Sequence, residues 1–457
     1  MLYNITKIKK EEDIMFVKIR LKNYKSLVDF SVDFLQKKGV AKKAIFVYGE
    51  NGVGKSNFAS AFYTLYESIQ TLSVRRVIQT ILEKKYEDKE INEEFIKYFS
   101  RNLRDTESII NNCKTINSDE NMELEFDFIL NGKMGTYLLV YDNEKLIREK
   151  LSYVLNKNKC VLFDLSENEK IINKKLFLDP EYADKIRNMV LQYEGKHSLL
   201  SIIINEKEEK TEGYIESKIH KALDEVILFF MTMSIKVKNG DKGERGALRL
   251  FHPIVAELTD GTINIDEQVE LDNAEVLLNE FFTKTYSDIK EVYYKRKQEN
   301  NKIKYELFFR KMVYNEILEV SYEAESTGTL HLINILPFLL MSIENTVVVI
   351  DEIDTGIHDL LVDNILNNII DSINGQLIVT THNTMLLDSD INPEYIYSFI
   401  VDEYANKELV SIADFEDRTH PNLNYRSRYL KGMYGGIPHL GDIDFEELND
   451  IFKLEGK

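Results

Sequence analysis

The sequence predicts an α/β fold: a mixed sheet with an antiparallel β subdomain and a mainly helical insertion. Buried strands are indicated by apolar runs within 346–354 and 375–387, and an amphipathic helix lies between them. This alternation is typical of a parallel sheet with helices on its faces. A hairpin pattern at 122–143, with a turn at Asn131–Gly132, adds antiparallel strands. Residues 180–235 have a mainly helical pattern.

Composition and charge limit the class of protein. The 457 residues are 44% hydrophobic and 11% aromatic, which indicates a folded chain of two or three lobes. No apolar run reaches the roughly 18 residues that span a bilayer. Two cysteines far apart suggest a reducing cytoplasm, and the richness in Lys, Ile and Asn suggests a bacterial protein, so we expect a cytoplasmic bacterial protein without a membrane partner. Cys113 and Cys160 do not suggest a disulfide framework or a metal site. The net charge of −19 repels a phosphate backbone, so any contact with nucleic acid requires a local basic patch.

The patterns divide the chain into five segments. Met15 directly precedes an alternating pattern, so residues 1–14 are expected to form an extension outside the fold. The other segments are an N-terminal lobe at 15–155, a mainly helical insertion at 156–315, a C-terminal lobe at 316–400 and a C-terminal segment at 401–457.

The segment FVYGENGVGKSN, residues 46–57, lies between an apolar run and a helical pattern. It contains the motif G-x-x-x-x-G-K-[ST], with Lys55 and Ser56 at its end. Glycines let backbone N–H groups turn around phosphate oxygens, and the following helix directs its positive end at the same anion. The lysine reaches the terminal phosphates and the serine hydroxyl can bind Mg²⁺. The residues expected to bind nucleotide are Gly49, Asn51, Gly52, Gly54, Lys55, Ser56 and Asn57.

Two acidic residues, Asp351 and Glu352, end the apolar run VVVI. Ligands of an open α/β sheet bind at the carboxyl ends of its strands, so both side chains are expected to face the phosphate loop. Asp351 suits Mg²⁺ coordination, and Glu352 is placed to polarise a water against a γ-phosphate. His382 follows the next buried strand and is expected to reach the same pocket. The expected catalytic residues are Lys55, Glu352 and His382, and the expected metal ligands are Ser56 and Asp351.

The order of these motifs resembles that of ABC-type ATPases in the SMC, RecF and OLD branch. The segment ESTGTLHLINILPFLL, residues 325–340, is similar to the signature segment of that branch and begins a predicted helix with Ser326, Gly328 and Thr329. The resemblance implies an ABC-type P-loop ATPase head that binds ATP and Mg²⁺ and hydrolyses ATP. It also implies that these three residues contact the ATP of an opposite subunit. Two heads would then form a homodimer around two nucleotides, and a higher oligomer is compatible with this arrangement.

Two further segments bear on this resemblance. IDTGIH, residues 353–358, resembles the D-loop and would place Asp354 near the dimer interface. The signature segment departs from the transporter pattern L-S-G-G-Q, which argues against a transporter subunit. Gln192 is the candidate for a glutamine-loop residue.

Both ends of the chain extend the resemblance. VKIRLKNYKSL, residues 17–27, is similar to the start of RecF-type heads. YRSRYLKGMYGGIP, residues 425–438, resembles a segment of small bacterial ATPases from phage-defence and abortive-infection pairs, such as the PARIS system. The resemblance implies a sensor or scaffold that controls a separately encoded effector, a nuclease or a toxin, and responds to a phage protein or DNA.

Other functions fit the same motifs. The basic segments at 293–304 and 418–431 could contact DNA phosphates, as in a RecF-like or SMC-like ATPase of DNA repair or maintenance. A nucleotide binder that does not hydrolyse ATP is a third alternative. The acidic residues after 401 are expected to form a solvated tail, because the buried alternating strands of a metal-dependent nuclease core do not accompany them.

Overall fold

The computed structural model describes residues 14–37, 39–86, 104–238, 243–249, 254–255, 257–416, 423–437 and 441–454. Of the predicted N-terminal extension, only Ile14 falls within these residues, and it begins the first strand.

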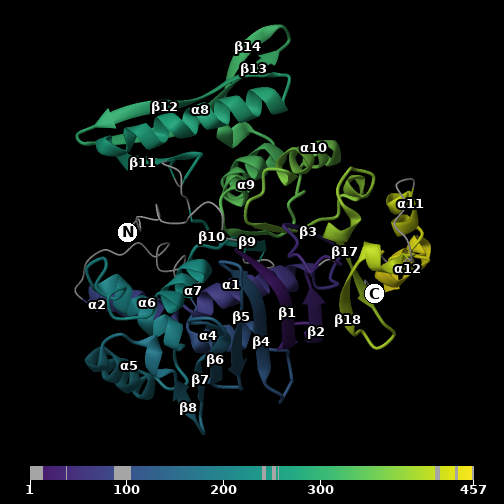
Figure 1. Cartoon of the computed structure of the whole chain (residues 1–457). Coiled ribbons are helices and arrows are strands. Elements are labelled where there is room, and N and C mark those ends of the chain that lie inside the picture. The colour runs from purple at the N-terminus through teal and green to yellow at the C-terminus, as the bar shows by residue number, and fades with distance from the viewer. Residues whose placement is uncertain are drawn as a thin grey trace.

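A seven-stranded mixed sheet forms the centre of the molecule (Figure 1). Its order is β10–β9–β15–β16–β3–β17–β18, and the five inner strands are parallel while the two edge strands are antiparallel to their neighbours. The apolar runs predicted as buried strands are β3, β15 and β16, and every residue in these three strands is buried. The strands span Ala44–Tyr48 (β3), Ser234–Lys238 (β9), Glu244–Ala247 (β10), Val347–Ile350 (β15), Gln376–Thr380 (β16), Ile396–Val401 (β17) and Lys407–Ser411 (β18).

A second seven-stranded sheet is entirely antiparallel and has the order β2–β1–β4–β5–β6–β7–β8. It contains the hairpin predicted at 122–143, as β4 and β5. Helix α1 (Lys55–Ser68) packs with both sheets in one hydrophobic core. The strands span Ile14–Tyr24 (β1), Leu27–Asp33 (β2), Met122–Leu130 (β4), Lys133–Tyr141 (β5), Leu146–Val154 (β6), Lys159–Ser166 (β7) and Lys170–Ile172 (β8).

The two faces of the central sheet belong to different cores, as the two-residue period of a strand dictates. Ile45 and Val47 of β3 pack in the core that contains α1. Phe46 and Tyr48 pack in the other core, which contains α9 (Thr327–Ile343) and α10 (Asp359–Ile370). The phosphate-loop helix and the helix of the signature segment are therefore on opposite faces of one sheet.

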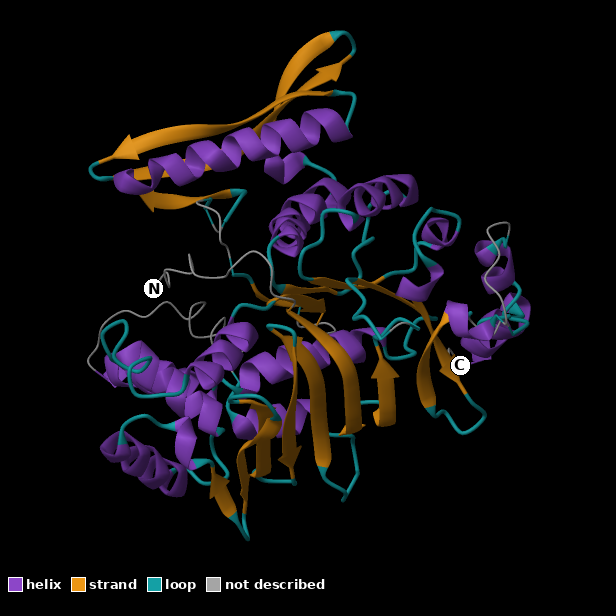
Figure 2. Cartoon of the chain, viewed as in Figure 1, coloured by secondary structure: helices purple, strands orange, loops and turns teal. Residues whose placement is uncertain are grey.

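A small third sheet lies beyond α9 and α10, where Figure 2 shows it at the top of the molecule with one long helix against it. Its strands pair in the order β11–β13–β12, β14 also pairs with β13, and α8 packs on β12. The predicted boundary at 316 falls between β13 and β14, which pair with each other. The elements span Asp260–Asn264 (β11), Gln268–Thr285 (α8), Ile289–Glu299 (β12), Lys302–Val313 (β13) and Glu316–Ser321 (β14).

The segment predicted as a mainly helical insertion contains both kinds of element. Its helices are α5 (Pro180–Gln192), α6 (Leu199–Glu209), α7 (Lys221–Met231) and α8. Its strands belong to all three sheets, because β7 and β8 extend the large antiparallel sheet and β9 pairs with β15 in the central one. The sequence of β9, SIKVK, is only five residues long. A pattern this short cannot be distinguished from the end of a helix by sequence alone.

The remaining α-helices are α2, α4, α11 and α12, of which α4 packs on α1 within the large core. Within the described residues, none of the helices has both the length and the apolar composition needed to cross a bilayer. Cys113 is buried, Cys160 is half-buried, and both are free thiols. These helices span Thr71–Tyr86 (α2), Thr106–Cys113 (α4), Tyr425–Leu430 (α11) and Phe445–Leu454 (α12).

Candidate active site

The predicted phosphate loop connects β3 to α1 at the carboxyl end of the central sheet. Gly49 begins the loop in a place with no room for a side chain, because a Cβ there would lie 2.8 Å from Val53 Cγ1 and 3.0 Å from Phe399 Cβ. Asn57 Nδ2 donates a hydrogen bond to Ser26 Oγ, 2.7 Å away, which ties the start of α1 to the β1–β2 turn. The loop therefore has the strand–loop–helix geometry that directs backbone N–H groups and the helix N-terminus at an anion.

Lys55 turns back onto its own loop. Its ammonium donates to the carbonyl oxygens of Gly49 at 2.7 Å and Glu50 at 2.9 Å. Burial lowers the pKa of Lys55 to about 8, although nearby carboxylates, first among them Glu352, oppose this effect. The lysine is thus a buried cation that a phosphate could draw away from two neutral carbonyl acceptors.

Asp351 is the first residue after β15 and is joined to three elements. Its Oδ1 accepts hydrogen bonds from Thr380 Oγ1 at 2.6 Å and from Ser56 Oγ at 3.2 Å. Its Oδ2 accepts from the backbone N–H of Lys238 at 3.2 Å. Burial raises the pKa of Asp351, and the hydrogen bonds from Thr380 and Ser56 oppose that rise.

The pair Ser56 and Asp351 fits a Mg²⁺ ion that is bound together with a nucleotide. A carboxylate and a hydroxyl lie within 3.2 Å of each other, and Mg²⁺ is usually held by one or two protein oxygens, phosphate oxygens and waters. Within the described residues, no group of three or more His, Cys, Asp or Glu side chains is arranged to hold a metal by itself. When bound, the ion would neutralise charge on the phosphates.

Glu352 has a left-handed backbone conformation, with φ of 51°. Its backbone N–H donates to Thr380 Oγ1 at 2.8 Å, and its carboxylate forms an ion pair with Lys238. Burial would raise the pKa of Glu352, but the hydrogen bond and charge of Lys238 outweigh burial, so the pKa lies below its ordinary value. Thr380 therefore orients both acids, since it donates to one and accepts from the backbone of the other.

His382 lies just after β16, beside β15, and its side chain is exposed. Its backbone N–H donates to Asp354 Oδ2 at 2.8 Å, and Thr381 Oγ1 donates to the same oxygen at 2.9 Å. Asp354 thus fixes the backbone from which the imidazole projects.

The predicted signature segment begins α9. Ser326 is its N-cap and accepts a hydrogen bond from the backbone N–H of Thr329 at 3.1 Å. Gly328 packs so closely on the carbonyl of Gly356 that a Cβ would collide with that oxygen. Within the residues that the structure describes, no hydrogen bond joins Ser326, Gly328 or Thr329 to the phosphate loop.

Sequence reasoning missed several residues that complete the site. Lys238 comes from β9, Thr380 from the end of β16, and Lys407 from β18, where its Nζ donates to Ser26 Oγ at 2.8 Å. Thr380 precedes the predicted His382 by two residues and ends the same strand. It could have been predicted by the same reasoning, that polar residues at the ends of these strands face the site. Nothing in the local sequence marked Lys238 or Lys407, because only sheet pairing brings their strands to the loop.

Gln192, the candidate for a glutamine-loop residue, ends α5, which packs on α6.

The C-terminal segment also forms part of the loop's surroundings. Gly436 has φ of 70°, and a Cβ there would collide with Ser398 Oγ and lie 3.4 Å from the Cα of Gly49. Tyr429 Oη donates to the carbonyl of Gly436 at 2.8 Å, and its ring meets that of Tyr48 edge to face at 5.8 Å. The C-terminal segment at 425–437 therefore packs directly on the phosphate loop.

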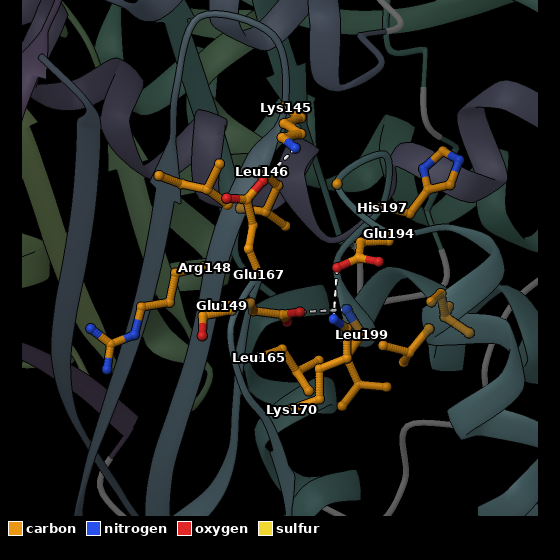
Figure 3. Close-up of a pocket in the computed structure, with 15 residues that line it drawn as sticks. Lys145, Leu146, Arg148, Glu149, Leu165, Glu167, Lys170, Glu194, His197 and Leu199 are labelled. Carbon is orange, nitrogen blue, oxygen red and sulfur yellow. Dashed lines mark hydrogen bonds and ion pairs between the residues drawn. The ribbon is translucent and has the colours of Figure 1, made fainter.

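Two cavities lie elsewhere, and the described residues that line them do not include the loop. The first, of about 50 Å³, lies beside the large antiparallel sheet, where Glu149 and His197 line it (Figure 3). Tyr137 Oη and the backbone N–H groups of Leu199 and Leu200 donate to Glu149, and burial raises its pKa to about 7. Glu149 therefore has a structural role, because its carboxyl group caps the start of α6. The second, of about 390 Å³, lies at the far end of α1 beside Glu67.

The chain is similar to several solved structures of SMC heads. Solved structures with a similar arrangement include an SMC head bound to the C-terminal winged-helix domain of ScpA, with 13% identity and a TM-score of 0.39 over 87% of this chain and 97% of that one. The SMC head domain of Thermotoga maritima has 14% identity and a TM-score of 0.35 over 87% and 98%. An Smc head with an extended coiled coil, bound to the C-terminal domain of ScpA derived from Pyrococcus furiosus, has 14% identity and a TM-score of 0.39 over 98% and 100%.

No curated protein matches the sequence. A family profile described as "AAA domain, putative AbiEii toxin, Type IV TA system" matches residues 44–388, which is more than half of the chain. The matched range contains the phosphate loop, the signature segment, the acidic strand end and His382. The chain therefore belongs to this AAA-domain family of P-loop ATPases.

Proposed function

We propose that the protein hydrolyses ATP with Mg²⁺ and that its nucleotide state controls a separately encoded effector in bacterial antiviral defence. The observation that carries the ATPase part is the network around Asp351, which joins Ser56 of the phosphate loop, Thr380 and the strand end that bears Glu352. One network thus joins a hydroxyl and a carboxylate that we propose to bind the metal with the proposed base at one edge of a sheet.

The roles of the residues follow from this arrangement. Lys55 would leave its carbonyl acceptors for the β- and γ-phosphates, and Ser56 and Asp351 would hold Mg²⁺. Glu352 would orient the attacking water, and His382 would approach the γ-phosphate from the next strand. Positioned charge of this kind is the main source of rate enhancement in phosphoryl transfer.

A dimer of two heads is part of the proposal. The start of α9 is separated from the phosphate loop of its own chain by the central sheet. Ser326 and Thr327 are exposed at this helix N-terminus, whereas Gly328 and Thr329 are buried behind them. A helix N-terminus is a natural anion site, so we expect Ser326, Gly328 and Thr329 to bind the ATP of a second copy. Closure of two heads around ATP gives two states that a trigger and an effector can each favour.

Control of a separate effector is proposed from the family description, which names a putative AbiEii toxin and a type IV TA system. We expect a nuclease or toxin to be supplied by a partner protein, and the trigger to be a phage protein or DNA.

The alternative, a DNA-repair or DNA-maintenance ATPase, has less support. Three cations of the basic segment at 293–304 are already paired with acids, Lys295 with Glu319, Arg296 with Asp272 and Glu275, and Lys297 with Glu299. The second basic segment lies partly outside the described residues. An ATP-dependent shift of duplex DNA that weakens steeply with salt would favour this alternative.

The sensor proposal is tested by co-expression with the product of the adjacent gene in the bacterial cytoplasm. We expect co-purification in at least one nucleotide state and a change in effector activity when ATP is hydrolysed. Failure to associate with ATP, with ADP and without nucleotide would exclude control of that effector, while leaving the ATPase activity to be judged by phosphate release.

A further inference from the structure

Lys238 is the last residue of β9 and touches both acids of the site. Its backbone N–H donates to Asp351 Oδ2 at 3.2 Å. Its ammonium pairs with Glu352 and donates to Thr355 Oγ1 at 3.1 Å. β9 pairs with β15, so this position is fixed by the central sheet and does not depend on a loop.

The contacts hold Glu352 in one place. Thr355 Oγ1 also donates to Glu352, to its backbone oxygen at 3.1 Å and its Oε2 at 3.4 Å. The ion pair therefore directs Oε2 at protein groups, whereas a base must direct an oxygen at water. The Lys238 and Glu352 side chains are 32% and 30% exposed, so the ion pair is partly accessible and can exchange partners.

Lys55 and Lys238 are bound to protein acceptors in this conformation. Lys55 is held by two loop carbonyls, and Lys238 is held by the candidate base. The phosphates of a nucleoside triphosphate carry more negative charge than either set of acceptors, so they can compete for both ammonium groups.

We propose that Lys238 is a positioning residue that restrains Glu352 until the γ-phosphate of a nucleoside triphosphate draws its ammonium away. This rests on the proposed ATP hydrolysis. Once released, Glu352 accepts a proton from the water whose oxygen bonds to the γ-phosphorus, while the bond from that phosphorus to the β-phosphate bridging oxygen breaks. Lys238 makes the base available only when substrate is present.

Other charged groups also face Glu352, and the test must account for them. Lys55 projects from α1, Asp351 and Asp354 flank the acid along the chain, and His382 follows β16; each of these influences the titration of the site. None of these residues is replaced in K238M, so a difference in kcat/KM from the native protein reports on the contacts of Lys238.

The test measures kcat and KM for Mg²⁺–ATP by phosphate release. K238M should raise kcat/KM by about 2- to 5-fold, the range of a partly exposed ion pair, because no ion pair has to break when substrate binds. The change should appear in KM and not in kcat, because saturating substrate has already drawn the native Lys238 away from Glu352. K238R should behave like the native protein. K145M is the matched control, because it removes an equally simple lysine–glutamate pair, with Glu167, beside the distant antiparallel sheet.

A second background separates this inference from the function on which it rests. In an E352Q protein, K238M should change nothing, since Lys238 is proposed to act through Glu352. T355V, a milder change, should also raise kcat/KM and serves as the test if K238M does not fold. A kcat/KM of K238M at or below the native value would overturn the inference. Equal turnover of native and E352Q proteins would instead overturn the assignment of Glu352 as base.

Discussion

Ser56 and Asp351 are joined by a hydrogen bond of 3.2 Å although 295 positions separate them in the chain. The bond connects the loop after β3 with the end of β15, and β16 lies between these two strands in the sheet. This relationship turns two separate motifs into one candidate Mg²⁺ site.

Asp351→Asn should abolish Mg²⁺-dependent turnover. The amide keeps the size of the side chain but loses the charge that attracts the ion, and we expect phosphate release to fall by at least about 100-fold. Phosphate release across a Mg²⁺ titration measures this. Asp29→Asn, on the exposed side of β2, is the control, and an equal loss there would point to a general charge effect.

ATP affinity should fall as pH rises above the pKa of Lys55. Burial sets that pKa at about 8, so the lysine is charged at pH 7 and mostly neutral at pH 9, whereas phosphate binding favours the charged form. The dissociation constant should therefore increase by up to about tenfold per pH unit above 8. Calorimetry in buffers of different ionisation enthalpy should show proton uptake. Lys55→Met should bind weakly with a flat profile; a native profile that is flat to pH 9 would contradict the shifted pKa.

Glu352→Gln should bind ATP and fail to hydrolyse it. Loss of a general base typically lowers the rate by about 10²- to 10⁴-fold. Lys238 can still donate a hydrogen bond to the neutral glutamine. Because ATP then persists, the two-headed state should accumulate, which light scattering with and without ATP can measure. Glu316→Gln, on exposed β14, should leave both properties unchanged.

Gly328→Ala should displace the start of α9. A Cβ would collide with the carbonyl of Gly356, and overpacking of this kind costs roughly 1–3 kcal/mol in the free energy of unfolding. Denaturant unfolding measures that loss, and ATP-dependent association should weaken with it. Gly441→Ala is the matched control, since no atom lies within 4 Å of the Cβ it would add.

Gly436→Ala should weaken ATP binding from the opposite end of the chain. The added Cβ would collide with Ser398 and press on Gly49, and φ of 70° adds strain of about 1–2 kcal/mol. Gly213→Ala has the same kind of φ strain in open space, so it separates strain from contact with the loop. Equal effects of the two variants on the ATP dissociation constant would argue against a role for the C-terminal segment.

The sequence was informative wherever chemistry and local pattern coincide. The loop motif, the acids after four apolar residues and the hairpin at 122–143 each carry their own periodicity, and the structure confirms the mixed α/β architecture they predicted. The signature helix begins at Thr327, with Ser326 as its N-cap, in agreement with the helix start that the sequence placed at this segment.

What the sequence could not predict depends on pairing between distant strands. β9 is five residues long within a largely helical region, yet it brings Lys238 to Asp351. Lys407 and Gly436 likewise reach the loop only through β18 and the turn after α11. Such contacts follow from sheet order, which no local periodicity encodes. The catalytic and nucleotide-binding roles of all these residues stay predictions.

The packing of Gly436 on Gly49 has a consequence for biosynthesis. The loop leaves the ribosome early, but its neighbour in the folded protein is made near the end of translation. At the usual bacterial rate of roughly 5–20 residues per second, the loop would wait on the order of 20 to 80 s for that neighbour. A nascent chain would therefore carry an incomplete nucleotide site for most of its synthesis, and ATP binding would begin only after the C-terminal segment has emerged.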